Sequence, residues 1–290
     1  MQITSKAAAL ASAAALFIGA LVTVTAQIPL PGQLPGVEPL HESGQDVTPA
    51  FEGWFKNPDG SFDMLFGYQN RNLKEEIDIP IGPNNKVEPF GPDAGQPTHF
   101  MPRRGWGVFT VTVPKDFGNK KVTWTLSTAG KTNAIPAGLD ARWEVDALKE
   151  VTSGNTPPVL SFGPTAGAPP ANQGPKSFNV PPLTATVGQP LALSLFATDD
   201  GKTRSQARAA AANRAPVVNV TWTKYRGPGT VTFANAKPAV DKDSHQAQTT
   251  ATFSEPGAYV LRVVGNDASG DGGGGFQCCW TNAVVRVTVK

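Results

Sequence analysis

Short segments in which apolar and polar residues alternate run along most of this chain, and they constrain its fold more than any other feature. Val122, Trp124 and Leu126 alternate with threonines, and residues 285–289 alternate between valine and polar residues. Successive side chains of an extended strand point to opposite faces, so a period of two predicts strands with one apolar face. Turn-forming residues separate the segments, since the chain has 30 glycines and 27 prolines. We therefore predict an all-β protein.

These segments fall into two groups, which predict two β-sandwich modules. The first group occupies residues 49–150 and includes the alternating segment 62–68, which we expect to have one apolar face. The second group occupies residues 183–290. Between them, residues 151–182 contain three proline pairs, and proline is excluded from the centre of a sheet. We expect a proline- and glycine-rich linker there, which also supplies the first edge of the second module.

The first 26 residues predict a signal peptide. Lys6 is followed by an uncharged stretch rich in alanine, leucine and valine, and Val24-Thr25-Ala26 places small residues before a cleavage point. The stretch approaches the roughly 20 residues that span a bilayer, so an uncleaved anchor is the alternative. Residues 27–48 are rich in proline, which predicts an extended tether. We expect the mature protein to have no membrane span and to be secreted, periplasmic or part of the cell envelope.

Motifs across residues 155–290 are similar to those of one known group of folds. They are Asn155-Thr156-Pro157-Pro158, Ala197-Thr198-Asp199-Asp200-Gly201, Val220-Thr221-Trp222, Gly227-Pro228-Gly229-Thr230-Val231-Thr232-Phe233 and Phe253-Ser254-Glu255-Pro256-Gly257-Ala258-Tyr259. Together they resemble PKD-like and cadherin-like immunoglobulin folds. The resemblance implies an immunoglobulin-like sandwich in which Trp222 is a core tryptophan and Tyr259 a corner tyrosine. The first module is not assigned to a family.

Aspartates in two loops of the second module predict a calcium site. Asp267 and Asp271 have the spacing of oxygen ligands at the start of a calcium loop, although Cys278 stands where an EF-hand would end in glutamate. In an immunoglobulin-like sandwich, the loop that carries Asp199 and Asp200 lies at the same end. These four aspartates are a candidate all-oxygen calcium site, and the sequence requires no cofactor. The alternative is that the aspartates and glycines form turns.

The only two cysteines, Cys278 and Cys279, are adjacent. Neighbouring Cα atoms lie about 3.8 Å apart across a trans peptide, closer than the roughly 4.4–6.8 Å of most disulfides. A vicinal disulfide therefore needs a distorted peptide, and it would stiffen the chain just before Trp280. The alternatives in an oxidising compartment are an intermolecular bridge and two free thiols. The vicinal disulfide is our leading interpretation.

A long loop in the first module contains a candidate ligand site. His99, Arg103, Arg104 and Trp106 lie close together in the sequence, and long loops in compact domains are often functional. These residue types can hold an anionic or sugar ligand. The alternative is a loop held in place by its own prolines.

Catalytic motifs are missing from the sequence. It contains no H-E-x-x-H, G-x-S-x-G, P-loop or dinucleotide-binding fingerprint, and its three histidines are far apart. Acids such as Asp63, Glu75, Glu76 and Asp78 do not have a spacing that requires a glycosidase pair. We therefore predict that the protein is not an enzyme. A secreted hydrolase with a site in the first module is an alternative, and it requires titratable groups that converge in a pocket.

The near-neutral charge and the predicted export suggest a function outside the cytoplasm. A formal net charge of +2 gives no overall attraction to nucleic acid. The leading prediction is a non-catalytic exported binding or structural protein that presents loops to a protein or polysaccharide partner. The other alternative is a carbohydrate-binding protein that uses Trp54, Trp106, Trp124 and Trp143, which requires exposed and coplanar rings.

Overall fold

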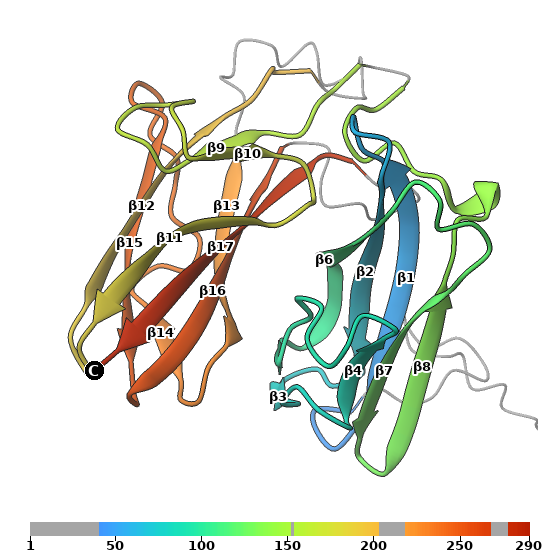
Figure 1. Ribbon diagram of the computed structural model, residues 1–290. Coiled ribbons are helices and arrows are strands. Elements are labelled where there is room, and N and C mark those ends of the chain that lie inside the picture. The colour runs from blue at the N-terminus through green and yellow to red at the C-terminus, as the bar shows by residue number, and fades with distance from the viewer. Residues whose placement is uncertain (1–40, 152–153, 203–217, 268–277) are drawn as a thin grey trace, which may run out of the picture. The chain divides into compact units, whose positions relative to one another are not determined.

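The computed structural model describes residues 41–151, 154–202, 218–267 and 278–290, and Asp271 falls outside these ranges. The described residues form 17 strands, and their one helical element is the 3-10 turn Ala141–Trp143. This confirms the all-β prediction (Figure 1). Within the described ranges, no helix has the length and hydropathy needed to cross a membrane.

The first module consists of two three-stranded antiparallel sheets and a short two-stranded ribbon. One sheet has the order β1-β2-β6, the other has the order β4-β7-β8, and β3 pairs with β5. The strands are β1 (Val47–Lys56), β2 (Phe62–Asn70), β3 (Ile77–Asp78), β4 (Asn85–Glu88), β5 (His99–Phe100), β6 (Arg103–Val113), β7 (Val122–Thr128) and β8 (Lys131–Ala137).

Aromatic side chains packed around Trp124 fill the core of the first module. The Trp124 ring is fully buried and meets Phe66 and Phe109 edge-on, with centroid distances of 6.1 and 4.9 Å. Trp124 Nε1 donates to Asn85 Oδ1 at 3.1 Å, so the polar edge of the indole has a partner. Val122, Trp124 and Leu126 are all buried, which confirms the apolar face predicted for this strand.

Strand β2 departs from its predicted pattern, because both of its faces are buried. Asp63 and Leu65, which the alternation placed toward solvent, are 0% exposed. Asp63 forms an ion pair with Lys176, and Leu65 packs with Val264 and Trp280. All three partners belong to the second half of the chain. The prediction of a single apolar face is therefore wrong here, because the second module covers the other face.

The second module is a two-sheet sandwich with immunoglobulin topology. Its sheets have the orders β10-β9-β12-β15-β14 and β11-β17-β16-β13. The first strand is divided between the sheets, since β9 pairs antiparallel with β12 and β11 runs parallel to β17. This arrangement follows the ABED and CFG sheets of immunoglobulin domains. The strands are β9 (Val159–Ser161), β10 (Ala171–Gln173), β11 (Phe178–Ala185), β12 (Leu191–Thr198), β13 (Asn219–Arg226), β14 (Val231–Phe233), β15 (Gln246–Phe253), β16 (Gly257–Asn266) and β17 (Trp280–Val289).

Two side chains confirm the immunoglobulin-like interpretation. Trp222 on β13 is 2% exposed and belongs to the core of the second module. Tyr259, near the start of β16, is 1% exposed, and its hydroxyl donates to Glu255 O at 2.9 Å. The same hydroxyl accepts a hydrogen bond from Gly229 N at 3.0 Å. A hydroxyl that returns to the backbone a few residues upstream is the tyrosine corner of this fold.

The described part of the proline-rich segment forms strands of the second module. The pair Pro169–Pro170 directly precedes β10, which pairs with β9. The pair at residues 181–182 coincides with a register shift between β11 and β17, and β11 is the edge strand of its sheet. Proline lacks a backbone donor, so an edge strand with an irregular register accommodates the pair.

Residues from Leu40 to Lys290 form one compact unit in which two large hydrophobic clusters remain distinct. A third cluster of Leu65, Val264 and Trp280 joins the modules. Gly107 on β6 lies against the Trp280 ring, and a Cβ at this position would be 2.8 Å from Cε2. Gly107 also has a φ of +46°, a left-handed conformation that glycine adopts readily. The junction therefore requires glycine here for both backbone and packing reasons.

Candidate functional site

His99 occupies a buried position between two carboxylates. It lies on β5 and is 6% exposed. Its Nδ1 is 2.9 Å from Asp78 Oδ1, and its Nε2 is 3.3 Å from Glu76 Oε2. Pairing of β3 with β5 places Asp78 directly opposite His99, which explains the first contact. Both ring nitrogens therefore face an acid.

The second module extends this array with a lysine that sequence reasoning missed. Lys224 on β13 has a side chain that is only 8% exposed, and its Nζ lies 3.3 Å from Asp78 Oδ1. The sequence did contain a signal. Val220, Trp222 and Lys224 alternate along one strand, so the lysine falls on an otherwise apolar face. A buried lysine normally requires a charged partner, and Asp78 supplies it.

A groove of 390 Å³ opens beside this array. Its lining combines apolar and charged side chains from both modules. The lining includes Glu76, Asp78, Trp222, Val231, Phe233 and Glu255. The pocket that the hydrolase alternative requires is therefore present, with titratable groups converging on it.

The contacts of His99 do not form a nucleophilic triad. In such a triad one imidazole nitrogen faces a carboxylate and the other faces the nucleophile. Here both nitrogens face carboxylates, and the described hydrogen bonds of His99 include no serine, threonine or cysteine. The arrangement instead holds His99 and Lys224 against acids that lie close together at the junction of the modules.

The structure brings together only two of the four residues of the predicted ligand loop, Arg104 and Trp106. Arg104 donates to Glu52 Oε1 at 2.5 Å and to Tyr68 O at 2.7 Å, and its guanidinium lies 4.1 Å from the centroid of the Trp106 ring. Arg104 and Trp106 therefore meet each other, as predicted, but Arg104 is already committed to contacts within the protein. Arg103 is exposed and has a φ of 69°.

Glu52, the partner of Arg104, is a buried acid with a side chain that is 1% exposed. Its second oxygen, Oε2, accepts a hydrogen bond from Gly107 N at 2.7 Å. Burial raises the pKa of Glu52 to about 7, although the charge of Arg104 and the hydrogen bond from Gly107 act in the opposite direction. The acid thus links β1 to the strand that packs against Trp280.

Charges at the junction are sorted by module. Among the residues that the structure describes, three ion pairs that cross it have the acid in the first module and the base in the second. The pairs are Asp63–Lys176 at 3.4 Å, Asp78–Lys224 at 3.3 Å and Asp93–Arg226 at 2.9 Å. Arg262 of the second module also donates to Gly107 O at 3.2 Å. Pairs of this kind fix the orientation of the two surfaces as well as attracting them.

The tryptophans of the first module do not form a sugar-binding platform. Trp54 and Trp124 are 7% and 0% exposed, so their faces are inaccessible to a ligand. Trp143 is 49% exposed but packs on Phe51, with a centroid distance of 5.5 Å. The row of exposed rings required by the carbohydrate alternative is absent from the described residues, because the alternating strands place two of these rings in the core.

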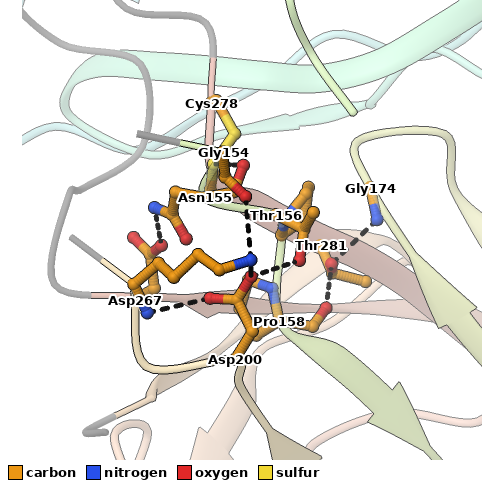
Figure 2. The surroundings of a disulfide bond; sticks show 12 residues. Gly154, Asn155, Thr156, Pro158, Gly174, Asp200, Asp267, Cys278 and Thr281 are labelled. Atoms are coloured by element: carbon orange, nitrogen blue, oxygen red, sulfur yellow. Dashed lines mark hydrogen bonds and ion pairs between the residues drawn. A yellow bond between two sulfur atoms is a disulfide. The ribbon is translucent and has the colours of Figure 1, made fainter. Parts of the chain in front are cut away.

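The two cysteines are bonded to each other immediately before β17. Figure 2 shows the surroundings of this vicinal disulfide. The peptide between Cys278 and Cys279 is cis, and both residues are buried. Asn155 lies beside the pair, with its carbonyl oxygen 3.7 Å from Cys279 Sγ, and its Nδ2 donates to Asp267 Oδ2 at 2.6 Å. The disulfide and Asp267 thus share one buried environment.

Three of the four predicted calcium ligands fall within the described residues. Burial raises the pKa of Asp199 to about 6, and the negative charges of Asp267 and Asp200 add to the shift. Asp200 accepts hydrogen bonds from Thr156 Oγ1 at 3.0 Å and Lys202 N at 2.9 Å. The described histidines, cysteines and acids contain no group of three or more arranged to hold a metal ion. Calcium binding stays a prediction.

Comparison with known proteins gives no family assignment. No family model matches the chain, and no curated protein matches it. Among solved structures, the D00-D0 domain of intimin is 12% identical, with a TM-score of 0.26 and coverage of 84% of this chain and 100% of that one. The titin Ig tandem A164-A165 is also 12% identical, with a TM-score of 0.22 and coverage of 85% and 99%.

Domains 4 and 5 of the S-layer protein SbsC are 11% identical, with a TM-score of 0.23. That match covers 59% of this chain and 65% of the length of those domains. The strand order and the tyrosine corner define the class more directly: this is an all-β protein whose second module is an immunoglobulin-like sandwich.

Proposed function

We propose that this chain is a non-catalytic exported protein that binds or holds a protein or polysaccharide partner outside the cytoplasm. The junction is the observation that carries the proposal. Asp78 of the first module pairs with the buried Lys224 of the second module and with His99. The Trp280 ring of the second module packs against Gly107 of the first. Such a junction makes the two modules a preorganised unit, which lowers the entropic cost of binding a large partner.

Two further features support export. The first 26 residues have the composition of a signal peptide. The two cysteines are bonded to each other, and disulfides persist mainly in oxidising compartments outside the cytoplasm. Binding or load-bearing by β-sandwich modules needs no catalytic group, in agreement with the contacts of His99.

The test is capture of a partner by the mature protein. Residues 27–290 would be immobilised and exposed to the culture of the source organism, with calcium and with chelator. We expect one protein or polysaccharide to be retained, and the purified partner to bind the purified protein in calorimetry. Retention of no partner, or cleavage of a glycan or peptide that His99→Gln abolishes, would contradict the proposal. Cleavage of that kind would favour the hydrolase alternative.

A further inference from the structure

The groove beside His99 opens between the edges of the two sheets of the second module. Strand β13 is the last strand of one sheet, and β14 is the last strand of the other. The side chains of Val231 and Phe233 on β14 are half-buried and pack against the core. Together with Trp222 they give the groove an apolar floor. The floor is therefore an exposed flank of the hydrophobic core.

The indole of Trp222 lies beside the groove. Trp222 is 2% exposed and lines the groove, and its Nε1 is a buried donor with no hydrogen-bond partner among the described residues. Buried tryptophans usually pair this N–H group, because an unsatisfied donor is costly. The indole N–H group is therefore a sensitive reporter of a ligand that enters the groove.

The charges at the groove define the second property of its ligand. Glu76 and Asp78 are 52% and 53% exposed at one side of the groove, and the exposed Glu255 also lines it. The charge of Asp78 is balanced by Lys224, and the Lys224 side chain is 8% exposed. Three carboxylates therefore line the groove, and the Lys224 ammonium group pairs with one of them. The lining is negative, so it attracts cations and repels anionic ligands.

We propose that the groove binds an extended segment of a partner polypeptide through one lysine or arginine side chain. The apolar stem of that side chain would lie on Phe233 and Val231, and its charged end would meet Glu76 and Glu255. A volume of 390 Å³ lies within the usual range of ligand pockets. This inference rests on the proposed binding function and names the chemistry of its partner.

A sugar fits the groove less well than a peptide. Stacking of a sugar requires an open aromatic face, and the Trp222 ring is almost completely buried. A basic side chain instead needs an apolar surface for its stem and carboxylates at its end. The groove offers both of these features.

The experiment uses the indole N–H signals of the mature protein in solution NMR. The chain has six tryptophans, and the variant Trp222→Phe identifies the signal of interest by its loss. Two short blocked peptides serve as probes: one contains a single arginine, and the other contains citrulline, which has the same shape without the charge. We expect a saturable shift of the Trp222 signal with the arginine peptide and at least about tenfold weaker binding of the citrulline peptide.

Two variants test the carboxylates. Glu255→Gln and Glu76→Gln should each weaken binding of the arginine peptide severalfold. The matched control Asp116→Asn removes one exposed acid from a loop outside the groove lining and should leave the affinity unchanged. The proposal is overturned if the Trp222 signal does not shift, or if both peptides bind equally. Either result leaves partner capture unaffected, so failure of this inference is distinguishable from failure of the proposed function.

Discussion

Replacing Gly107 with alanine tests how tightly the two modules are packed. The new methyl group would lie 2.8 Å from Trp280 Cε2 and 3.0 Å from Trp280 Nε1. The ring is 0% exposed and packs with Leu65 and Val264, so the new methyl group would force a buried side chain to shift. Alanine would also have to adopt a φ of +46°. Both effects act in the folded state.

The two costs can be estimated separately. Overpacking of a well-packed core costs typically about 1–3 kcal/mol. A left-handed conformation costs a non-glycine residue about 1–2 kcal/mol. Gly107→Ala should therefore lower the free energy of unfolding by roughly 2–5 kcal/mol. Gly118→Ala is the matched control, since Gly118 has a φ of +63° and its Cβ would meet only Asp116 O, at 3.9 Å. It should lose only about 1–2 kcal/mol.

Urea unfolding followed by tryptophan fluorescence measures both variants on the same scale. The difference between the two losses reports the packing against Trp280 without the backbone contribution. If Gly107→Ala is destabilised no more than Gly118→Ala, the junction is looser than the Trp280 contact indicates. The argument for a rigid two-module unit would then lose its main support.

Three further outcomes follow from the structure. Burial raises the pKa of Glu52 from 4.5 to about 7, so the stability contributed by this group is complete below pH 4.5 and is lost as the pH rises through 7. The free energy of unfolding should thus fall by about 3 kcal/mol more in the wild type than in Glu52→Gln between pH 4.5 and pH 7. Urea unfolding that gives the same change with pH for both proteins would contradict this. Tyr259→Phe leaves Gly229 N without its acceptor and should cost about 1–3 kcal/mol, measured by urea unfolding; an unchanged midpoint would argue against the corner contact. If the predicted calcium site forms, calcium should raise the melting temperature of the wild type but not that of Asp199→Asn, and a melting temperature that does not respond to chelator would remove this prediction.

Local alternation predicted the strands whose surroundings are set within one module. Val122, Trp124 and Leu126 are buried as expected, and so are Trp222 and Tyr259, whose roles came from resemblance to immunoglobulin folds. In each case the buried side chains belong to the core of a single module. Local sequence is sufficient when a strand has one buried face and one solvated face.

The candidate site was less predictable, because it depends on contacts between distant segments. Asp63 and Leu65 alternate as solvent-facing residues should, and only the presence of the second module explains why they are buried. Lys224 lies 146 positions from its partner Asp78, so the local sequence around one residue does not predict its contact with the other. The strand pattern marked Lys224 as unusual, but it could not supply the partner. Contacts of this kind are determined by the docking of whole modules.

The sorting of charges at the junction has a consequence for any attempt to divide or recombine this chain. Separated modules would each expose one half of these three ion pairs, carboxylates on the first and cationic groups on the second. These groups attract each other between the two fragments and would repel between two copies of one fragment. An unrelated sandwich grafted onto either module would leave several charges unmatched. Each half is therefore suited to the other half of its own chain, and the two are best expressed and engineered together.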